Sequence, residues 1–136
     1  MENECLLCCK YDKRIFVSEY FFAIYDDFPV REGHMLIIPK RHVEHLTGLL
    51  PMEFNTLHCV LQEVVMRLKI DFQADGYNLG INGGEAAGQT LPHLHIHLIP
   101  RRFGDVPSPA GGIRNFLPNP LMPYKAPILS HYEDNE

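Results

Sequence analysis

The chain has 136 residues and a mass of 15.6 kDa, which is enough for one domain with a hydrophobic core and too little for two ordinary domains. A formal net charge of -5 argues against a protein that mainly coats a nucleic acid backbone, although a local cluster of donors can still bind a small anion. No segment approaches the roughly 18 apolar residues of a membrane span, and the N-terminus lacks a secretory-signal pattern. We therefore expect a cytoplasmic protein with neither nucleic acid nor a membrane as a partner.

Short runs of aromatic and branched residues, bounded by turn residues, predict five strands. Apolar residues at spacings of three and four predict one long helix between the third and fourth strands. This order is typical of an α+β domain with an antiparallel sheet of about five strands and one main helix. Pro39 and Pro100 are expected to end the third and fifth strands, because proline cannot donate to a sheet ladder. The predicted strands are residues 14–18, 21–25, 34–38, 77–81 and 93–99, and the predicted helix is 51–71.

The first turn of the predicted helix carries mixed signals. Pro51 suits the first helical position and Glu53 lies near the positive end of the helix dipole, whereas Leu50 offers no polar cap. Cys59 is interpreted as a small buried hydrophobe. The face expected to pack on the sheet consists of Phe54, Leu57, Leu61, Val64 and Leu68.

Residues 103–136 differ in composition from the rest of the chain. They hold six of the 11 prolines, together with Gly111 and Gly112. We expect a folded domain over residues 1–102, followed by an irregular Pro/Gly-rich tail that packs on the domain or on a partner subunit. His131, within this tail, is expected to be exposed.

Three histidines alternate with apolar residues in the segment from Pro92 to Pro100. On a strand, His93, His95 and His97 would share one face. Buried imidazoles need hydrogen-bond partners, so three in a row indicate chemistry rather than packing. Neighbours on one face of a strand lie about 6.5–7 Å apart, and the outer pair therefore about 13 Å apart. Zinc needs nitrogen at about 2.0–2.1 Å, so one straight strand brings at most two of these rings to a metal.

A metal ion held by the three rings is the first interpretation of the histidine row, and nucleophilic catalysis is the second. Imidazole titrates near neutrality, and its neutral form can attack phosphorus at pH 7. Such an attack needs neighbouring donors that hold the phosphoryl oxygens. His95, flanked by a second imidazole and preceded by a loop with Gly83, Gly84 and Gly88, fits this requirement.

A second cluster lies near the N-terminus. Cys5 and Cys8 have the spacing of a zinc knuckle, but two thiolates do not complete a site. In a reducing compartment this pattern indicates either a metal site or free thiols rather than disulfides.

Several motifs together resemble the histidine triad (HIT) family. The segment His93-Leu-His-Ile-His-Leu-Ile matches the family's triad, and Gly88-Gln89-Thr90 stands at its phosphate-contacting turn. Asn82 matches an asparagine before that turn, and residues 33–42 match the strand that supplies a fourth histidine, His34. The matches follow the family's order from about Cys5 to Pro100.

The resemblance implies a HIT-like fold and a nucleotide hydrolase or nucleotidyl transferase. The expected reaction is attack on the α-phosphate of dinucleoside polyphosphates, nucleoside phosphoramidates or related adenylylated compounds, through a covalent nucleotidyl-histidine intermediate. His95 would be the nucleophile, His97 would contact the phosphate and help protonate the leaving group, and His34 would orient the triad. Gln89 completes the expected catalytic set. The expected nucleotide-binding residues are Leu6, Leu7, Ile24, Tyr25, Asp26, Asn82, Gly88, Gln89, Thr90, His95 and His97.

Within that set, the resemblance assigns two kinds of contact. Leu6, Leu7 and Ile24 would form the base pocket, and an adenine nucleotide is the expected substrate. Asp26 would bind the ribose hydroxyls, because a carboxylate accepts from two donors. The alternative for Asp26 is a solvated turn aspartate.

The resemblance also implies a structural zinc site and a dimer. A bacterial branch of the family carries the same Cys pair and completes zinc with the counterparts of His42 and His93, so the implied ligands are Cys5, Cys8, His42 and His93. Cys9 and His45 are competing ligands. No organic cofactor is expected, and the family's homodimers use the main helix and adjoining strands.

The tail resembles that of some bacterial members around Arg114, which either reaches a distal phosphate or lies on the surface. Two alternatives to the enzyme remain open. One is a non-catalytic nucleotide-binding regulatory protein, and the other is a zinc-dependent hydrolase in which the histidines hold a catalytic metal.

Overall fold

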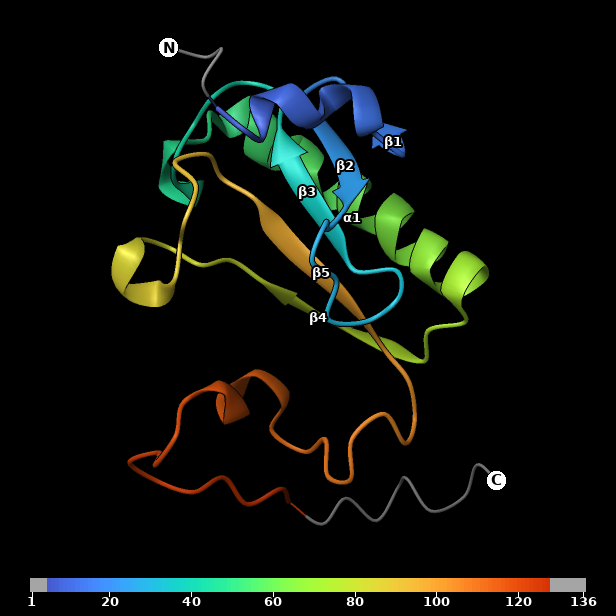
Figure 1. Ribbon diagram of the computed structural model, residues 1–136, viewed down its shortest axis with the longest axis vertical. Helices are drawn as coiled ribbons and strands as arrows, with labels where there is room; N and C mark the ends of the chain where they lie inside the picture. Colours follow the sequence, from blue (N-terminus) through green and yellow to red (C-terminus); the bar gives the residue numbers. More distant parts are fainter. Residues whose placement is uncertain (1–4, 128–136) are drawn as a thin grey trace. The chain divides into compact units, whose positions relative to one another are not determined.

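A computed structural model describes residues 5–127 (Figure 1). These residues form two compact units, one ending at Phe103 and the other beginning at Gly104. The second unit contains one short 3-10 helix, η5 (Gly112–Phe116), and is otherwise irregular. Arg114 is exposed and its guanidinium lies 4.6 Å from the ring centroid of Tyr124. His131 lies outside the described residues.

The first unit has the predicted α+β fold, a five-stranded antiparallel sheet with one main helix (Figure 1). The strand order is β1-β2-β3-β5-β4, and every neighbouring pair is antiparallel. The long helix α1 (Pro51–Phe72) connects β3 to the edge strand β4, so that β5 returns between them. The strands are β1 (Phe16–Val17), β2 (Phe21–Tyr25), β3 (Met35–Pro39), β4 (Gly76–Gly80) and β5 (Ile96–Arg101).

The strand boundaries differ from the prediction at the prolines and histidines. Pro39 is the last residue of β3, opposite Phe21, and Pro100 lies within β5, opposite Tyr77. Pro39 therefore ends β3 as predicted, whereas β5 continues one residue beyond Pro100, where the missing N–H is tolerated close to the strand end. His34 precedes β3, and His93 and His95 both precede β5, which leaves only His97 of the row within a strand.

One face of the sheet packs against α1. Leu57, Val60, Val64 and Leu68 are buried on the helix, against side chains from β2, β3 and β5. Two predictions for this helix are wrong. Phe54, expected on the packed face, is 55% exposed, and Cys59, expected to be buried, is exposed. At about 100° per residue, Cys59 lies about 200° around the helix from Leu57, on the opposite face.

The other face of the sheet is covered in part by the N-terminal segment. Leu7 packs with Phe22, Ile24, Leu36 and neighbouring apolar side chains in a second cluster. The 3-10 helix η2 (Cys8–Lys13) follows this segment and contacts β2. All five residues of β3 are consequently buried, and the strand reads as a continuous apolar run.

A buried carboxylate organises the start of α1. The Glu53 side chain, 3% exposed, accepts the Leu50 N–H at 2.8 Å and forms a salt bridge to Arg41 Nη2 at 2.7 Å. Glu53 thus supplies the cap that Leu50 lacks, and Arg41 links the end of β3 to the helix. Hydrogen bonding from Arg41 lowers the pKa of Glu53 below its usual value. Within residues 5–127, no helix combines the length and apolar character needed to cross a bilayer.

Gly33 fixes the approach to His34. Its φ is +93°, and a Cβ on Gly33 would lie 2.7 Å from the ring of Phe72 at the end of α1. Only glycine fits this position without strain. The turn before β3 therefore packs directly on the helix, and this packing determines the position of the next residue, His34.

We predict that Glu53→Gln lowers the free energy of unfolding at pH 7 by about 1–2 kcal/mol, because the charged partner of Arg41 is lost while an oxygen remains to cap Leu50. The folded-state pKa of Glu53 is depressed, so its contribution is complete above pH 4.5 and is lost as the pH falls through the folded value. Urea denaturation of the variant and the parent at pH 7 and pH 3 checks this. The exposed Glu63→Gln change is the control; an equal effect of both changes, or a Glu53 effect independent of pH, contradicts the prediction.

Candidate functional site

Three of the four predicted catalytic side chains meet at one end of β5. His34 Nε2 lies 3.0 Å from His97 Nδ1, and the centroids of these two rings are 5.2 Å apart. The rings of His95 and His97 are also 5.2 Å apart. The pairing of β3 with β5, with Leu36 opposite His97, brings the two strands' histidines together.

The direction of the His93 ring divides the histidine row into two groups. Leu94, Ile96 and Leu98 are buried, as the alternation predicts. His93 lies before the strand and is fully buried, with its ring turned to the N-terminal cysteines rather than to His95. The row is therefore divided between two side-chain clusters, in line with the expectation from the spacing that the three rings do not share one metal ion.

A backbone carbonyl fixes the tautomer of His95. The Nδ1 atom lies 2.9 Å from the carbonyl oxygen of His93. A carbonyl oxygen only accepts, so Nδ1 must carry the hydrogen and the neutral ring keeps its lone pair on Nε2. The ring is partly exposed. In the neutral form of His95, Nε2 is thus the ring nitrogen that keeps a lone pair.

A chain of hydrogen bonds fixes the other two histidines. The Val30 N–H donates to His34 Nδ1 at 3.2 Å, so in the neutral ring the hydrogen is on Nε2. His34 Nε2 then donates to His97 Nδ1, which leaves the hydrogen of neutral His97 on Nε2. Among the described residues this Nε2 is buried and finds no hydrogen-bond partner. A buried donor without an acceptor indicates a position where a ligand oxygen belongs.

Burial lowers the pKa of His34 and the pKa of His97, and the negative charge of Asp26 opposes both shifts. The positive charges that His95 and His34 would carry lower the pKa of His97 further. The neutral tautomers of His34 and His97 are therefore the dominant forms of these two rings at pH 7.

Asp26 follows β2 and contacts both histidines. Its Oδ1 accepts the Phe28 N–H at 2.9 Å. Its Oδ2 lies 3.4 Å from His34 Nε2 and 3.8 Å from His97 Nδ1. The sequence analysis did not foresee this contact. Asp26, His34 and His97 have the composition of a metal site. A metal on His34 Nε2 would move the hydrogen of the neutral ring to Nδ1, but Nδ1 already accepts the Val30 N–H, so the hydrogen bonds of His34 do not suit a metal ligand.

The glycine-rich loop is braced by Gln89. Its Oε1 accepts the Gly84 N–H at 2.9 Å, and its Nε2 donates to the carbonyl oxygens of Glu44 and Leu91 at 3.0 and 3.1 Å. All three bonds go to backbone groups of this chain: two lie within residues 84–91, and the third joins the loop to Glu44. The Gln89 side chain therefore holds the loop together. Gly88, with a φ of +92°, closes the short 3-10 helix η4 (Glu85–Ala87).

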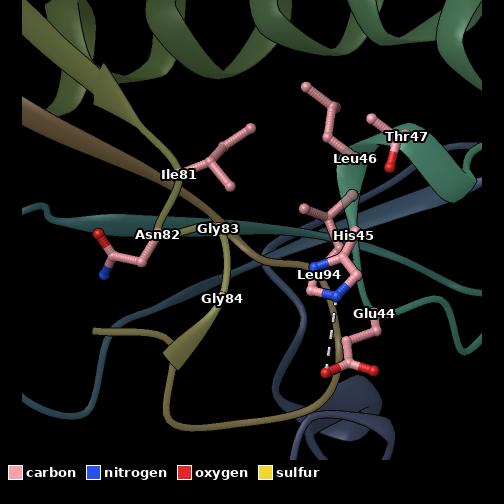
Figure 2. Close-up of a pocket in the computed structure, with 9 residues that line it drawn as sticks. All are labelled: Glu44, His45, Leu46, Thr47, Ile81, Asn82, Gly83, Gly84 and Leu94. Carbon is pink, nitrogen blue, oxygen red and sulfur yellow. Dashed lines mark ion pairs between the residues drawn. The ribbon is translucent and has the colours of Figure 1, made fainter. Parts of the chain in front are cut away.

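Two hollows flank this loop. Asn82, Gly83 and Gly84 face residues 44–47 across a hollow of about 300 Å³, shown in Figure 2, where a dashed line marks the ion pair between His45 and Glu44. A second hollow of about 450 Å³ lies beside the Gly88-Gln89-Thr90 turn. Glu44 lines both, and Gln89 Nε2 contacts its carbonyl.

The residues expected to hold the base differ in accessibility. Leu7 and Ile24 are each 3% exposed and belong to the core beneath the N-terminal segment. Leu6 is 61% exposed and Tyr25 is 43% exposed. Tyr25 packs edge-on against the ring of Phe72 at 5.7 Å, which fixes its orientation at the end of β2.

The second site is a Cys/His cluster that could hold a metal ion. Cys5, Cys8, His42 and His93 place their ligand atoms within 4.8 Å of one another. Cys5 Sγ and Cys8 Sγ each lie 3.4 Å from His93 Nδ1, and Cys8 Sγ lies 3.5 Å from His42 Nδ1. A tetrahedral zinc with bonds of about 2.0–2.3 Å keeps its donors about 3.3–3.8 Å apart, so these separations fit such an ion.

The arrangement around His93 supports a metal ligand. Its Nε2 is 2.9 Å from the Pro39 carbonyl oxygen, so Nε2 carries the hydrogen and Nδ1 offers its lone pair to the thiols. The competing ligands lie elsewhere: Cys9 is exposed outside the cluster, and His45 pairs with Glu44 at 3.8 Å. Burial lowers the pKa of His93, which keeps this ring neutral.

Sequence reasoning missed the backbone groups that fix these tautomers, namely the Val30 N–H and the carbonyls of Pro39 and His93. Every residue carries such groups, so no residue type signals their role. Only the proline at the end of β3 gave a hint, because its carbonyl lies at a strand terminus.

The first unit combines a five-stranded antiparallel sheet with two side-chain clusters. One is a cluster of histidines at the start of β5, and the other is the Cys/His cluster. Together these features define the class to which the protein belongs. The HIT domain family model matches residues 9–104. The chain belongs to the HIT family.

Relatives and solved structures agree with this assignment. The chain is 42% identical over 77 residues to the asymmetrical bis(5'-nucleosyl)-tetraphosphatase of Schizosaccharomyces pombe, covering 57% of this chain and 42% of that protein. It is 39% identical over 90 residues to the bis(5'-adenosyl)-triphosphatase of Dictyostelium discoideum, covering 66% and 60%. The chain thus spans less than two thirds of these two relatives. A Zn-bound histidine triad family protein from Mycobacterium smegmatis superimposes with a TM-score of 0.71 at 36% identity, covering 79% of this chain and 82% of that one.

We predict that Gln89→Ala loosens the glycine-rich loop without unfolding the domain, because three hydrogen bonds within the loop region are lost together. Hydrogen exchange measured by mass spectrometry should show the Gly84 amide exchanging about ten times faster, a change of the size of one lost hydrogen bond. Amides of α1 serve as the internal control. Unchanged exchange at residues 82–91 would contradict the bracing role.

Proposed function

We propose that this protein is a nucleotide hydrolase or nucleotidyl transferase that attacks the α-phosphate of an adenine nucleotide through His95. The observation that carries the proposal is the bond from His95 Nδ1 to the His93 carbonyl, which directs the lone pair of the neutral ring to Nε2. Two relatives named as a tetraphosphatase and a triphosphatase of dinucleotides support the same reaction class. Dinucleoside polyphosphates, nucleoside phosphoramidates and related adenylylated compounds are the substrates we propose.

The proposed reaction has two displacements at phosphorus. In the first, His95 Nε2 forms a bond to the α-phosphorus, and the bond to the leaving group breaks. In the second, water or another acceptor displaces His95 and releases the nucleoside monophosphate. His97 Nε2, buried and without an acceptor in the described chain, is placed to donate to a phosphoryl or leaving-group oxygen. His34 holds His97 in the tautomer that makes this possible.

The remaining contacts follow from what each side chain presents. The exposed Asn82, Gly88 and Thr90 border the hollows beside the braced loop, where backbone and side-chain donors meet a phosphate or ribose. Leu6 and Tyr25 are the accessible apolar surfaces for the base, whereas Leu7 and Ile24 support them from the core. Gln89 acts through the loop it braces.

We further propose that the protein acts as a homodimer, that the unit after residue 103 packs on the domain or its partner, and that it works in the cytoplasm. Exposed apolar side chains on α1, including Met66 and Ile70, support an association surface. None of the four cysteines forms a disulfide in the described part of the chain, which suits a reducing compartment.

We predict that His95→Ala reduces hydrolysis of diadenosine polyphosphate or an adenosine phosphoramidate by at least 10³-fold, because no other imidazole has its free nitrogen in this position. Binding of AMP should change little, as measured by calorimetry. Mass spectrometry of quenched parent protein should find AMP bound to His95. Equal turnover by parent and variant would refute the mechanism, and tight AMP binding without any turnover by the parent would favour a nucleotide-binding regulatory protein.

We propose zinc as the ion of the Cys/His cluster, with Cys5, Cys8, His42 and His93 as ligands and a structural role. The two thiols, two ring nitrogens and their separations fit a closed tetrahedral site. When bound, zinc would supply a cross-link between the N-terminal segment and His93, two residues before the proposed nucleophile. His95 is not part of this cluster, which argues against a catalytic metal.

We predict that the parent protein contains about one zinc per chain and that Cys8→Ala contains much less, measured by elemental analysis, because three of the four ligands do not complete a tetrahedral site. Cys9→Ala is the matched control, since this neighbouring thiol is exposed and outside the cluster. The melting temperature of the Cys8 variant should fall and lose its dependence on added chelator. Stoichiometric zinc in both variants would overturn the ligand assignment.

A further inference from the structure

The carboxylate of Asp26 has two separate environments. Oδ1 is held by the Phe28 N–H at 2.9 Å, which closes the turn after β2. Oδ2 lies 3.4 Å from His34 Nε2 and 3.8 Å from His97 Nδ1, in a side chain that is only 15% exposed. The turn therefore fixes one oxygen and presents the other to the gap between the two rings.

Protonation of His97 creates a conflict in that gap. A neutral imidazole is a very weak acid, so His97 must carry hydrogen on both nitrogens before it can give one to a leaving group. His34 cannot move its own hydrogen to Nδ1, because that atom accepts the Val30 N–H. Two N–H groups, on His34 Nε2 and His97 Nδ1, would then face each other across 3.0 Å.

Only one anion is placed to relieve this conflict. In the part of the chain that the structure describes, the titratable groups that act on the pair are Asp26 after β2 and His95 before β5, and only Asp26 is negative. Its Oδ2 is adjacent to both of the opposed nitrogens. A small movement of either ring would turn its N–H away from the opposing N–H and let it donate to this oxygen.

We propose that Asp26 is a positioning residue whose carboxylate accepts the N–H displaced when the His34–His97 pair takes up a proton, so that His97 serves as the general acid. This role rests on the proposed function and adds to any contact of Asp26 with ribose. Burial lowers the pKa of His97, and the charge of Asp26 opposes that shift, in agreement with the geometry.

The protons balance over the two displacements. The pair enters with one extra proton from solvent, and His97 Nε2 gives that proton to the leaving atom as the phosphorus–His95 bond forms and the phosphorus–leaving-group bond breaks. In the second displacement, water loses a proton to His97 Nε2 as its oxygen bonds to phosphorus and the bond to His95 breaks. Asp26 keeps its contact with the opposed N–H throughout and is not consumed.

The test compares leaving groups in Asp26→Asn. Asparagine still offers an oxygen to the Phe28 N–H but carries no charge. For an adenylyl ester or amide with a poor leaving group, an alkoxide or an alkylamine, kcat/KM should fall about 10²-fold, the size of a general-acid contribution. For the p-nitrophenyl ester of AMP, whose leaving group needs no proton, only the part of the loss that comes from a ribose contact should remain, so the loss should be at least about tenfold smaller.

Substrates without ribose hydroxyls separate the two roles of Asp26. With 2',3'-dideoxy analogues, the leaving-group dependence of the Asp26→Asn effect should persist. A loss that is the same for both leaving groups, or one that vanishes with the dideoxy analogues, assigns Asp26 to the ribose alone and overturns the proposal. Failure of the proposed function is a different result: the parent then forms no nucleotidyl adduct on His95 with the p-nitrophenyl ester.

Imidazole titration by NMR provides a readout that does not depend on turnover. Removing the negative charge should lower the apparent pKa of the His34–His97 pair by about one unit and move the alkaline limb of kcat for poor leaving groups to lower pH. Asp27→Asn is the matched control, because Asp27 is exposed and pairs with Lys10 at 2.6 Å. Unchanged titration in Asp26→Asn would also overturn the proposal.

Discussion

The geometry of both sites depends on His93, which makes a different contact with each of its polar groups. Its Nδ1 faces the two thiols, its Nε2 donates to the Pro39 carbonyl, and its own carbonyl accepts from His95 Nδ1. The ring is completely buried, so these bonds replace its contacts with water. Ordering the N-terminal segment around this ring therefore also orders the backbone that selects the tautomer of His95. The Cys/His cluster and His95 are thus linked through one residue, whose ring contacts the cluster and whose backbone carbonyl contacts His95.

The fold gives this residue a rigid frame. Helix α1 covers one face of the sheet with Leu57, Val64 and Leu68, and Glu53 and Arg41 tie the start of the helix to the end of β3. The other face is covered near the cysteines but keeps partly exposed histidines at the start of β5. Chemistry on this side does not disturb the helix packing, because the alternation along β5 sends Ile96 and Leu98 to the core and His97 to the site. Because one face carries the core and the other carries the polar cluster, a small sheet can hold both.

Much of this could be predicted from the sequence, and the failures have physical reasons. Alternation and apolar spacing predicted the sheet and helix because side-chain direction follows directly from the two periods. The separation of His93 from His95 followed from the length of an extended residue. Phe54 and Cys59 were misplaced because apolar character does not distinguish the centre of a helix face from its edge or its far side. The contact of Asp26 with the histidine pair depends on β2 and β3 lying side by side, which joins residues distant in sequence only after folding.

The histidine pair also shows where the structure departs from the ordinary rules of packing. His97 Nε2 is buried with a hydrogen and has no acceptor among the described residues, an arrangement that destabilises a folded chain by about 1–3 kcal/mol. Asp26 is kept largely from water beside two rings that are mostly neutral, so its charge is not fully compensated either. Under the proposed mechanism, one event would remove both departures: a phosphoryl oxygen would accept from Nε2, and a proton on the pair would compensate the carboxylate. An anionic substrate would then complete the hydrogen bonds of the site, which is the behaviour expected of preorganised catalytic groups.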